Sequence, residues 1–178
     1  NKIWNAARFV LLNLEDFEFT PLNRAEYTLA DRWILSRLNG LIRKVTTELE
    51  AYEIGEAARF LYDFFWGEFC DWYIELIKPR LYSKKPEVRK IAQNVLLQVL
   101  NKSLQLLHPF MPFITEEIWQ HLPGDRESIM ISSWPQFLPE QKDQEAEANM
   151  ELVMEVIRAV RNLRSEMNVP PGRFAEIG

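Results

Sequence analysis

Residues 54–78 read IGEAARFLYDFFWGEFCDWYIELIK, and this stretch decides the fold that the sequence predicts. Drawn as a helix, it carries aromatic and aliphatic side chains almost all the way round. A helix of that kind is normally buried inside a larger structure. We therefore expect residues 54–78 to form the central helix of a bundle. We expect the helix to end at Pro79, because the residue before a proline disfavours helical geometry.

Helices are also predicted on both sides of this stretch. Thr28 followed by Asp31 resembles a capping box that opens one of them. Pro86 suits the first turn of another, and Pro109 and Pro112 mark a break after which a short helix restarts. The predicted flanking helices cover residues 1–14, 28–51, 86–107, 112–121 and 145–167.

These elements predict an all-α fold, a helical bundle over residues 1–168. Residues 122–141 are rich in Pro, Gly and Ser and are expected to be irregular, with a short strand-like stretch at 128–132. Residues 169–178 resemble the truncated beginning of a following element. The chain begins with Asn1 and residues 3–14 already resemble the middle of a protein, so we expect a piece from the interior of a longer one.

Composition narrows the class of protein. The chain has 178 residues, a net charge of −5 and a single cysteine, Cys70. One cysteine excludes an intramolecular disulfide and favours a reducing compartment, so we expect a cytoplasmic protein. No secretory signal and no long apolar span is evident, and no membrane association is expected.

Motifs that carry chemistry are missing from these residues. There is no glycine-rich phosphate loop, no nucleophile elbow and no metal-binding helix motif. His108 and His121 are the only histidines and stand thirteen residues apart without nearby ligands, which argues against a metal site. Cys70 lies in the most apolar helix, where a small buried hydrophobe is the ordinary role. We expect no catalytic residue, metal or cofactor in this chain.

The first helix carries an unusual aromatic residue. At about 100° per residue, Ile3, Trp4 and Val10 share an apolar face. Phe9 falls on the opposite face, among the polar side chains of Lys2, Asn5 and Arg8. An exposed aromatic ring beside cations and an amide suits single-stranded RNA, because the ring stacks on a base and the cations meet phosphates. Periodicity leaves open that Phe9 packs against a neighbouring helix or a missing domain instead.

Polar residues are scarce on the central helix. Glu68, Asp71, Glu75 and Lys78 form its only polar face, with Ile74 at the edge. Carboxylates can accept hydrogen bonds from base amino groups, although solvated surface is the simpler interpretation. Six basic residues follow between Lys78 and Lys90, either a phosphate-binding patch or a solvated loop and helix start.

Four segments resemble one family of proteins. Residues 1–10 (NKIWNAARFV), 30–39 (ADRWILSRLN) and 68–75 (EFCDWYIE) are similar to the anticodon-binding domain of class I aminoacyl-tRNA synthetases. Residues 107–119 (LHPFMPFITEEIW), followed by Trp134-Pro135, resemble the valyl enzymes in particular. The similar segments occur in the family's order along almost the whole chain.

The resemblance implies a helical bundle that grips the anticodon of tRNA(Val) and follows a catalytic domain. It implies a parent enzyme, a monomeric valine–tRNA ligase, that activates valine with ATP and Mg²⁺ and esterifies it to tRNA. The family's His-Ile-Gly-His and Lys-Met-Ser-Lys-Ser signatures are absent here, so catalysis and editing would belong to domains outside this chain. Those domains would be its other partners.

The resemblance also carries over an anticodon site, residue by residue. The matching positions lie on the first helix and on the end of the central helix: Lys2, Asn5, Arg8, Phe9, Ile74, Glu75 and Lys78. Trp4 and Trp72 face apolar sides of their helices and are assigned to the core. The motif at 108–112 is expected to redirect the chain.

Two alternative functions and the role of three arginines remain open at this point. The same module could belong to an isoleucyl- or leucyl-tRNA synthetase, although the wording of 107–119 favours the valyl enzymes. A helical scaffold could use its exposed aromatics to bind protein. The last helix carries Arg158, Arg161 and Arg164 at three-residue spacing, and these could meet tRNA, another domain or only water.

Overall fold

The central stretch forms one long helical rod. The computed structural model describes residues 1–19, 23–170 and 173, and in it the rod consists of α3 (Ile54–Tyr62), a π-helical segment (Asp63–Tyr73) and α4 (Ile74–Leu81). Phe65, Phe69 and Tyr73 are almost completely buried along it. The described residues contain no β-strand, so the predicted all-α bundle with a central aromatic helix is confirmed.

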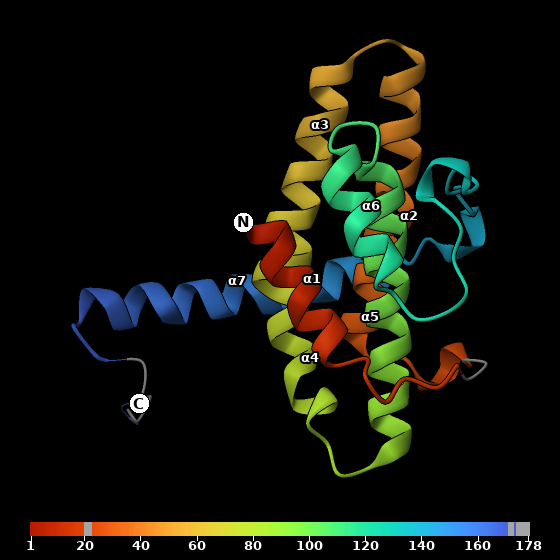
Figure 1. Cartoon of the computed structure of the whole chain (residues 1–178). Helices are drawn as coiled ribbons and strands as arrows, with labels where there is room; N and C mark the ends of the chain where they lie inside the picture. The colour runs from red at the N-terminus through yellow and green to blue at the C-terminus, as the bar shows by residue number, and fades with distance from the viewer. Residues whose placement is uncertain (20–22, 171–172, 174–178) are drawn as a thin grey trace.

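Two long helices run beside this rod (Figure 1). α2 (Leu29–Glu50) begins at the predicted capping box, in which Thr28 and Asp31 cap each other's backbone N–H groups. α5 (Pro86–Leu107) starts with Pro86 in its first turn, as predicted. Their apolar faces supply most of the core with the rod, because a stripe every three to four residues faces inward on each helix.

Two shorter helices cover one side of the bundle. α1 (Lys2–Leu12) packs on α5 and α6 (Pro112–Gln120) through Ile3, Ala7 and Val10. At the break before α6, His108 Nδ1 lies 2.8 Å from the Thr115 hydroxyl. This contact supports the expected role of 108–112 in redirecting the chain.

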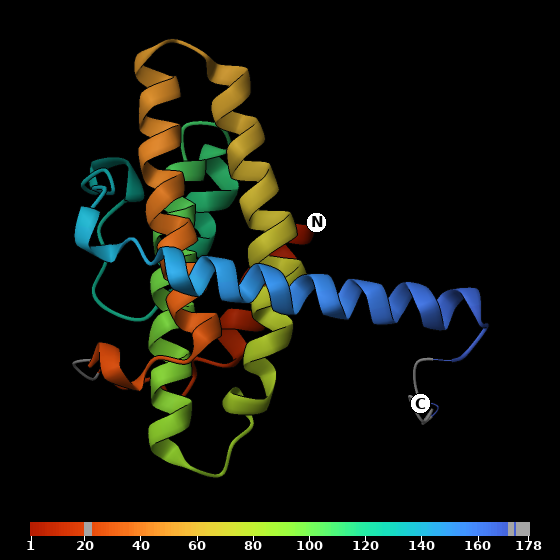
Figure 2. The same ribbon diagram turned by 180° about the vertical axis from the view of Figure 1, so that it is seen from behind.

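The last helix crosses the bundle and leaves it. α7 (Gln144–Glu166) packs its first half on α2 through Ala146, Met150 and Met154, while its second half projects outward (Figure 2). Apolar side chains on the projecting part are exposed to solvent: Val156, Val160, Leu163 and Met167. The predicted element at 169–178 lies largely outside the described residues.

Polar contacts at the start of α7 fix it to α2. The Asp143 carboxylate caps the backbone N–H of Ala146 at 2.9 Å and accepts two hydrogen bonds from the Arg32 guanidinium, at 2.7 and 3.2 Å. The Asp143 backbone N–H donates to Ser36 Oγ at 2.8 Å. The hydrogen bonds from Arg32 lower the pKa of Asp143 below its ordinary value of 3.8.

The contribution of Asp143 to stability is expected to depend on pH. A lowered pKa in the folded state means that this contribution is complete at neutral pH and disappears as the pH falls through the folded-state pKa, below about pH 4. Asp143→Asn keeps a good capping residue but removes the charge. Urea unfolding should therefore show the variant to be less stable at pH 7, with the difference shrinking towards pH 3. A difference that is the same at both values would contradict this role.

Two sequence predictions about local structure were wrong. Residues 128–132 form a 3₁₀ turn (Ile129–Ile131), not a strand. No strand among the described residues pairs with this stretch. Instead, the Glu116 carboxylate accepts hydrogen bonds from the Ser128 hydroxyl and the Ile129 backbone N–H. Pro79 does not end the central helix, which continues to Leu81 because the buried Leu81 side chain and the Arg80 ion pair with Asp31 hold the last turn in place.

Candidate nucleic-acid interface

The structure brings the two halves of the predicted RNA site together. The Lys78 ammonium on α4 lies over the Phe9 ring on α1, 5.8 Å from its centroid. The Lys2 ammonium on α1 forms an ion pair of 2.6 Å with Asp71, one turn before α4. Residues from the first helix and from the end of the central helix therefore form one surface, called the α1–α4 surface below.

Phe9 is less exposed than the helical wheel indicates. The ring is half-buried and packs against the core as well as under Lys78. The wheel considers α1 alone and cannot include α4, which covers part of the ring. Phe9 thus contacts a neighbouring helix and still presents part of its ring to solvent.

Ile74 is not at the surface, which corrects its place in the predicted site. Its side chain is 7% exposed and belongs to the core. The wheel for residues 54–78 assumed a uniform α-helix, but residues 63–73 are π-helical. Hydrogen bonds from i to i+5 turn the chain by fewer degrees per residue, so every position after the segment rotates relative to the α-helical prediction.

The charged residues of the surface are already partly paired. Glu75 Oε1 accepts a hydrogen bond from Lys78 Nζ at 2.6 Å, and both side chains remain more than one third exposed. The hydrogen bond to Asp71 raises the pKa of Lys2, which keeps its ammonium charged at neutral pH. Exposed pairs of this kind contribute little to stability, so a phosphate can compete for either cation at low cost.

Arg8 and Asn5 are the side chains of this surface that are free to bind. Both are exposed, and neither makes a side-chain hydrogen bond or ion pair with any residue in the described part of the chain. Arg8 offers a planar fork of donors that suits phosphate. Asn5 offers both a donor and an acceptor. Together with the Phe9 ring, they supply the three kinds of contact that single-stranded RNA uses.

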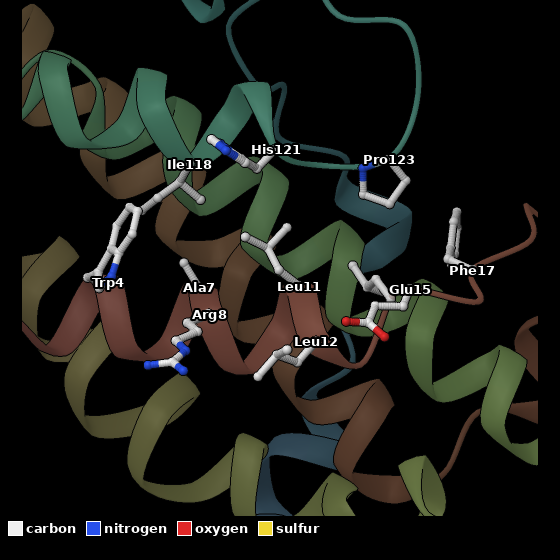
Figure 3. A pocket seen from close by; sticks show the side chains of 11 residues that line it. Trp4, Ala7, Arg8, Leu11, Leu12, Glu15, Phe17, Ile118, His121 and Pro123 are labelled. Atoms are coloured by element: carbon white, nitrogen blue, oxygen red, sulfur yellow. The ribbon is translucent and has the colours of Figure 1, made fainter.

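Trp4 was wrongly assigned to the core. Its side chain is 46% exposed and lines a cavity between α1 and α6, where it points toward α6 (Figure 3). The buried face of α1 is centred on Ile3, Ala7 and Val10, so Trp4 lies at its edge. Only the placement of α6 decides whether that edge is covered. The apolar character of tryptophan gave no signal of this exposure.

Trp72 fits its core assignment only in part. It is half-buried, and the guanidinium groups of Arg158 and Arg161 lie over its ring, 5.4 and 5.5 Å from the centroid. Cation–π contacts of this kind hold α7 against the central rod. Two of the three spaced arginines thus have a structural contact, and Arg164 donates hydrogen bonds to the backbone carbonyls of Pro170 and Arg173.

The basic stretch between Lys78 and Lys90 is largely neutralised. Arg80 pairs with the buried Asp31, Arg89 with Asp16, and Lys90 with Glu18. With Lys78 also paired, four of its six cations lie beside carboxylates. The charges at this end of the bundle therefore serve mainly to connect helices and loops.

Other chemistry finds little support in the described residues. No group of three or more His, Cys, Asp or Glu side chains within them could hold a metal ion. Burial raises the pKa of the Cys70 thiol to about 12, so the thiol stays protonated and unreactive at neutral pH. None of the helices in the described ranges has the length and apolar character needed to cross a membrane.

Comparisons with known proteins identify the family of the chain. Residues 31–177 match the family model described as the anticodon-binding domain of tRNA ligase. The chain is 56% identical over 177 residues to the valine–tRNA ligase of Carboxydothermus hydrogenoformans, and 52% and 50% identical over 178 residues to those of Clostridium acetobutylicum and Bacillus subtilis. Each alignment covers 99% of this chain but 20% of the relative. The chain thus belongs to the family of tRNA-ligase anticodon-binding domains and spans about a fifth of the length of these relatives.

Proposed function

We propose that this chain is the module of a valine–tRNA ligase that binds the anticodon loop of tRNA(Val). The observation that carries the proposal is the α1–α4 surface, where the half-buried Phe9 ring lies beside the side chains of Arg8 and Asn5, which are unpaired among the described residues. The identity with three valine–tRNA ligases supports the choice of tRNA.

The remaining four fifths of such a protein would carry the chemistry. In this proposal the parent enzyme activates valine with ATP and Mg²⁺ and transfers it to tRNA(Val), and it acts as a monomer in the cytoplasm. The domains that do this would be the partners of the bundle in the same polypeptide. The bundle itself would contribute by selecting the RNA.

The polar groups of the surface fit the bases of a valine anticodon. Its middle A and last C both carry exocyclic amino groups, which donate hydrogen bonds. The Glu75 carboxylate and the Asn5 side-chain oxygen are acceptors that can receive them. Lys2, Arg8 and Lys78 would contact the phosphates, and the Phe9 ring would stack on a base.

Phe9→Ala is expected to weaken binding of a valine-anticodon hairpin by about 5- to 150-fold, since stacking contributes about 1–3 kcal/mol per base. Fluorescence anisotropy with a labelled hairpin measures this directly.

Arg8→Ala should reduce the slope of log affinity against log salt by about 0.7, because one fewer counterion is released from single-stranded RNA.

The matched control is Phe113→Ala on α6, because Phe113 is 91% exposed and lies outside the α1–α4 surface. It should bind the hairpin as the parent chain does. Urea unfolding of Phe9→Ala checks that its weaker binding is not a loss of fold. Equal binding of valine and altered anticodons, together with unchanged binding by Phe9→Ala, would refute the proposal.

A further inference from the structure

A groove runs beside the α1–α4 surface, on the other side of α1. It has a volume of about 580 Å³ and lies between α1 and the end of α6 (Figure 3). Its walls are mainly apolar and come from Trp4, Ala7, Leu11 and Ile118. The space is large enough for a flat aromatic ligand, and sites of this kind are typically apolar with a few polar groups at the edge.

Trp4 gives the groove an open aromatic surface with a free donor. The side chain is 46% exposed, and its indole N–H has no hydrogen-bond partner among the residues that the structure describes. By contrast, the indole N–H of Trp119 donates to the Glu127 carbonyl oxygen, and that of Trp134 donates to the Thr46 hydroxyl. Trp4 can therefore both stack on a ring and donate a hydrogen bond at the same place.

Arg8 connects the groove with the α1–α4 surface. It lines the groove, yet its side chain points to the edge of α1 away from α6 (Figure 3). Trp4 and Phe9 are five residues apart, which places them about 7.5 Å apart along the helix and about 140° apart around it. One base cannot contact both rings. Two bases on opposite sides of α1 could do so, with the phosphate between them at Arg8.

We propose that the groove between α1 and α6 binds a second unpaired base of the same RNA loop, stacked on Trp4. The proposal rests on the proposed function, because the occupant is inferred from continuity with the α1–α4 surface through Arg8. The phosphate end of the groove is the end near Trp4 and Arg8, since Glu15 at the other end repels phosphate. His121 lies on the α6 side, with Nδ1 2.8 Å from the Glu117 carbonyl oxygen.

The test measures which loop base each aromatic residue holds. Hairpins with a valine anticodon are prepared with an abasic site at each unpaired loop position in turn, and their affinities are measured for the parent chain, Trp4→Ala and Phe9→Ala. We expect Trp4→Ala to weaken binding about 5- to 150-fold. We also expect that the abasic site at one loop position does not weaken the binding of Trp4→Ala any further, because the base that Trp4 would hold is already lost. For Phe9→Ala, the abasic site without further effect should be at a different loop position.

Two variants separate stacking from other causes. Trp4→Phe keeps an aromatic ring and should recover most of the binding lost in Trp4→Ala, whereas Phe113→Ala, outside the groove, should leave binding unchanged. Because Trp4 is half exposed, its variants should unfold at nearly the same urea concentration as the parent chain.

The outcomes distinguish this inference from the proposed function. If Trp4→Ala binds like the parent chain while Phe9→Ala binds weakly, the second base site is refuted and the α1–α4 site stands. The second base site is also refuted if Trp4→Ala weakens binding but every abasic hairpin loses affinity equally for Trp4→Ala and for the parent chain. If the parent chain binds no hairpin, both proposals fail.

Discussion

Asp31→Ala is expected to lower the free energy of unfolding by about 3–5 kcal/mol, because it breaks a buried ion pair from one side. Asp31 is fully buried and pairs with the Arg80 guanidinium. It also accepts hydrogen bonds from the Thr28 backbone N–H at 3.0 Å and from the Tyr73 hydroxyl at 2.8 Å. One carboxylate therefore joins the start of α2, the π-helical segment and the end of α4.

The groups that remain explain the size of this effect. Burial, together with the charge of Asp31, raises the pKa of Tyr73 well above its ordinary value, so its hydroxyl stays protonated and donates. Without Asp31, the Tyr73 hydroxyl is left without an acceptor, and the Arg80 guanidinium keeps only a hydrogen bond of 3.3 Å to the Thr28 hydroxyl. An unpaired buried donor costs more than the lost hydrogen bond.

Urea unfolding followed by circular dichroism measures the loss. The control is Glu56→Ala, which removes an exposed pair with Arg59 one turn away on α3. It should shift the midpoint far less than Asp31→Ala. Similar shifts for the two variants would show that Asp31 does not organise the bundle.

Phe69→Ala is also expected to lower the free energy of unfolding by about 3–5 kcal/mol. Phe69 is completely buried in the π-helical segment. Its ring lies between those of Phe65 and Tyr73, with centroids 5.3 and 6.3 Å away. The cavity left by alanine would be lined by rings that cannot move inward without disturbing the rod.

Phe113→Ala again provides the comparison, since it removes the same side chain from a position 91% exposed to solvent. Its unfolding midpoint should stay close to that of the parent chain. If Phe69→Ala lost no more stability than Phe113→Ala, the aromatic row would not be the centre of the core.

The starts of α2 and α5 followed from local chemistry, and the sequence was sufficient to predict them. The capping box at Thr28 and Asp31 and the proline at the start of α5 act within one turn of chain, and both are where expected. The all-round apolar stretch indicated the centre of the bundle because burying it needs neighbours on every side. The resemblance along the chain indicated the family, which the comparisons confirmed.

The candidate site was predicted less completely. Four of its first-helix residues and two from the central helix lie on or beside one surface, whereas Ile74 is in the core. The π-helical segment rotated that position inward, and no sequence signal marks such a segment. Trp4 was missed because hydrophobicity alone does not show whether another helix covers a side chain.

The sequence by itself determined the apolar helix at 54–78 and its burial, because periodicity and capping act locally along the chain, and the resemblance of four segments indicated the family. Only the tertiary structure decided that this helix continues past Pro79, changes its turn at residues 63–73 and brings Lys78 over Phe9. Those outcomes depend on contacts between residues far apart in sequence, where the burial of Leu81 and the Arg80 pair with Asp31 override the local preference of proline.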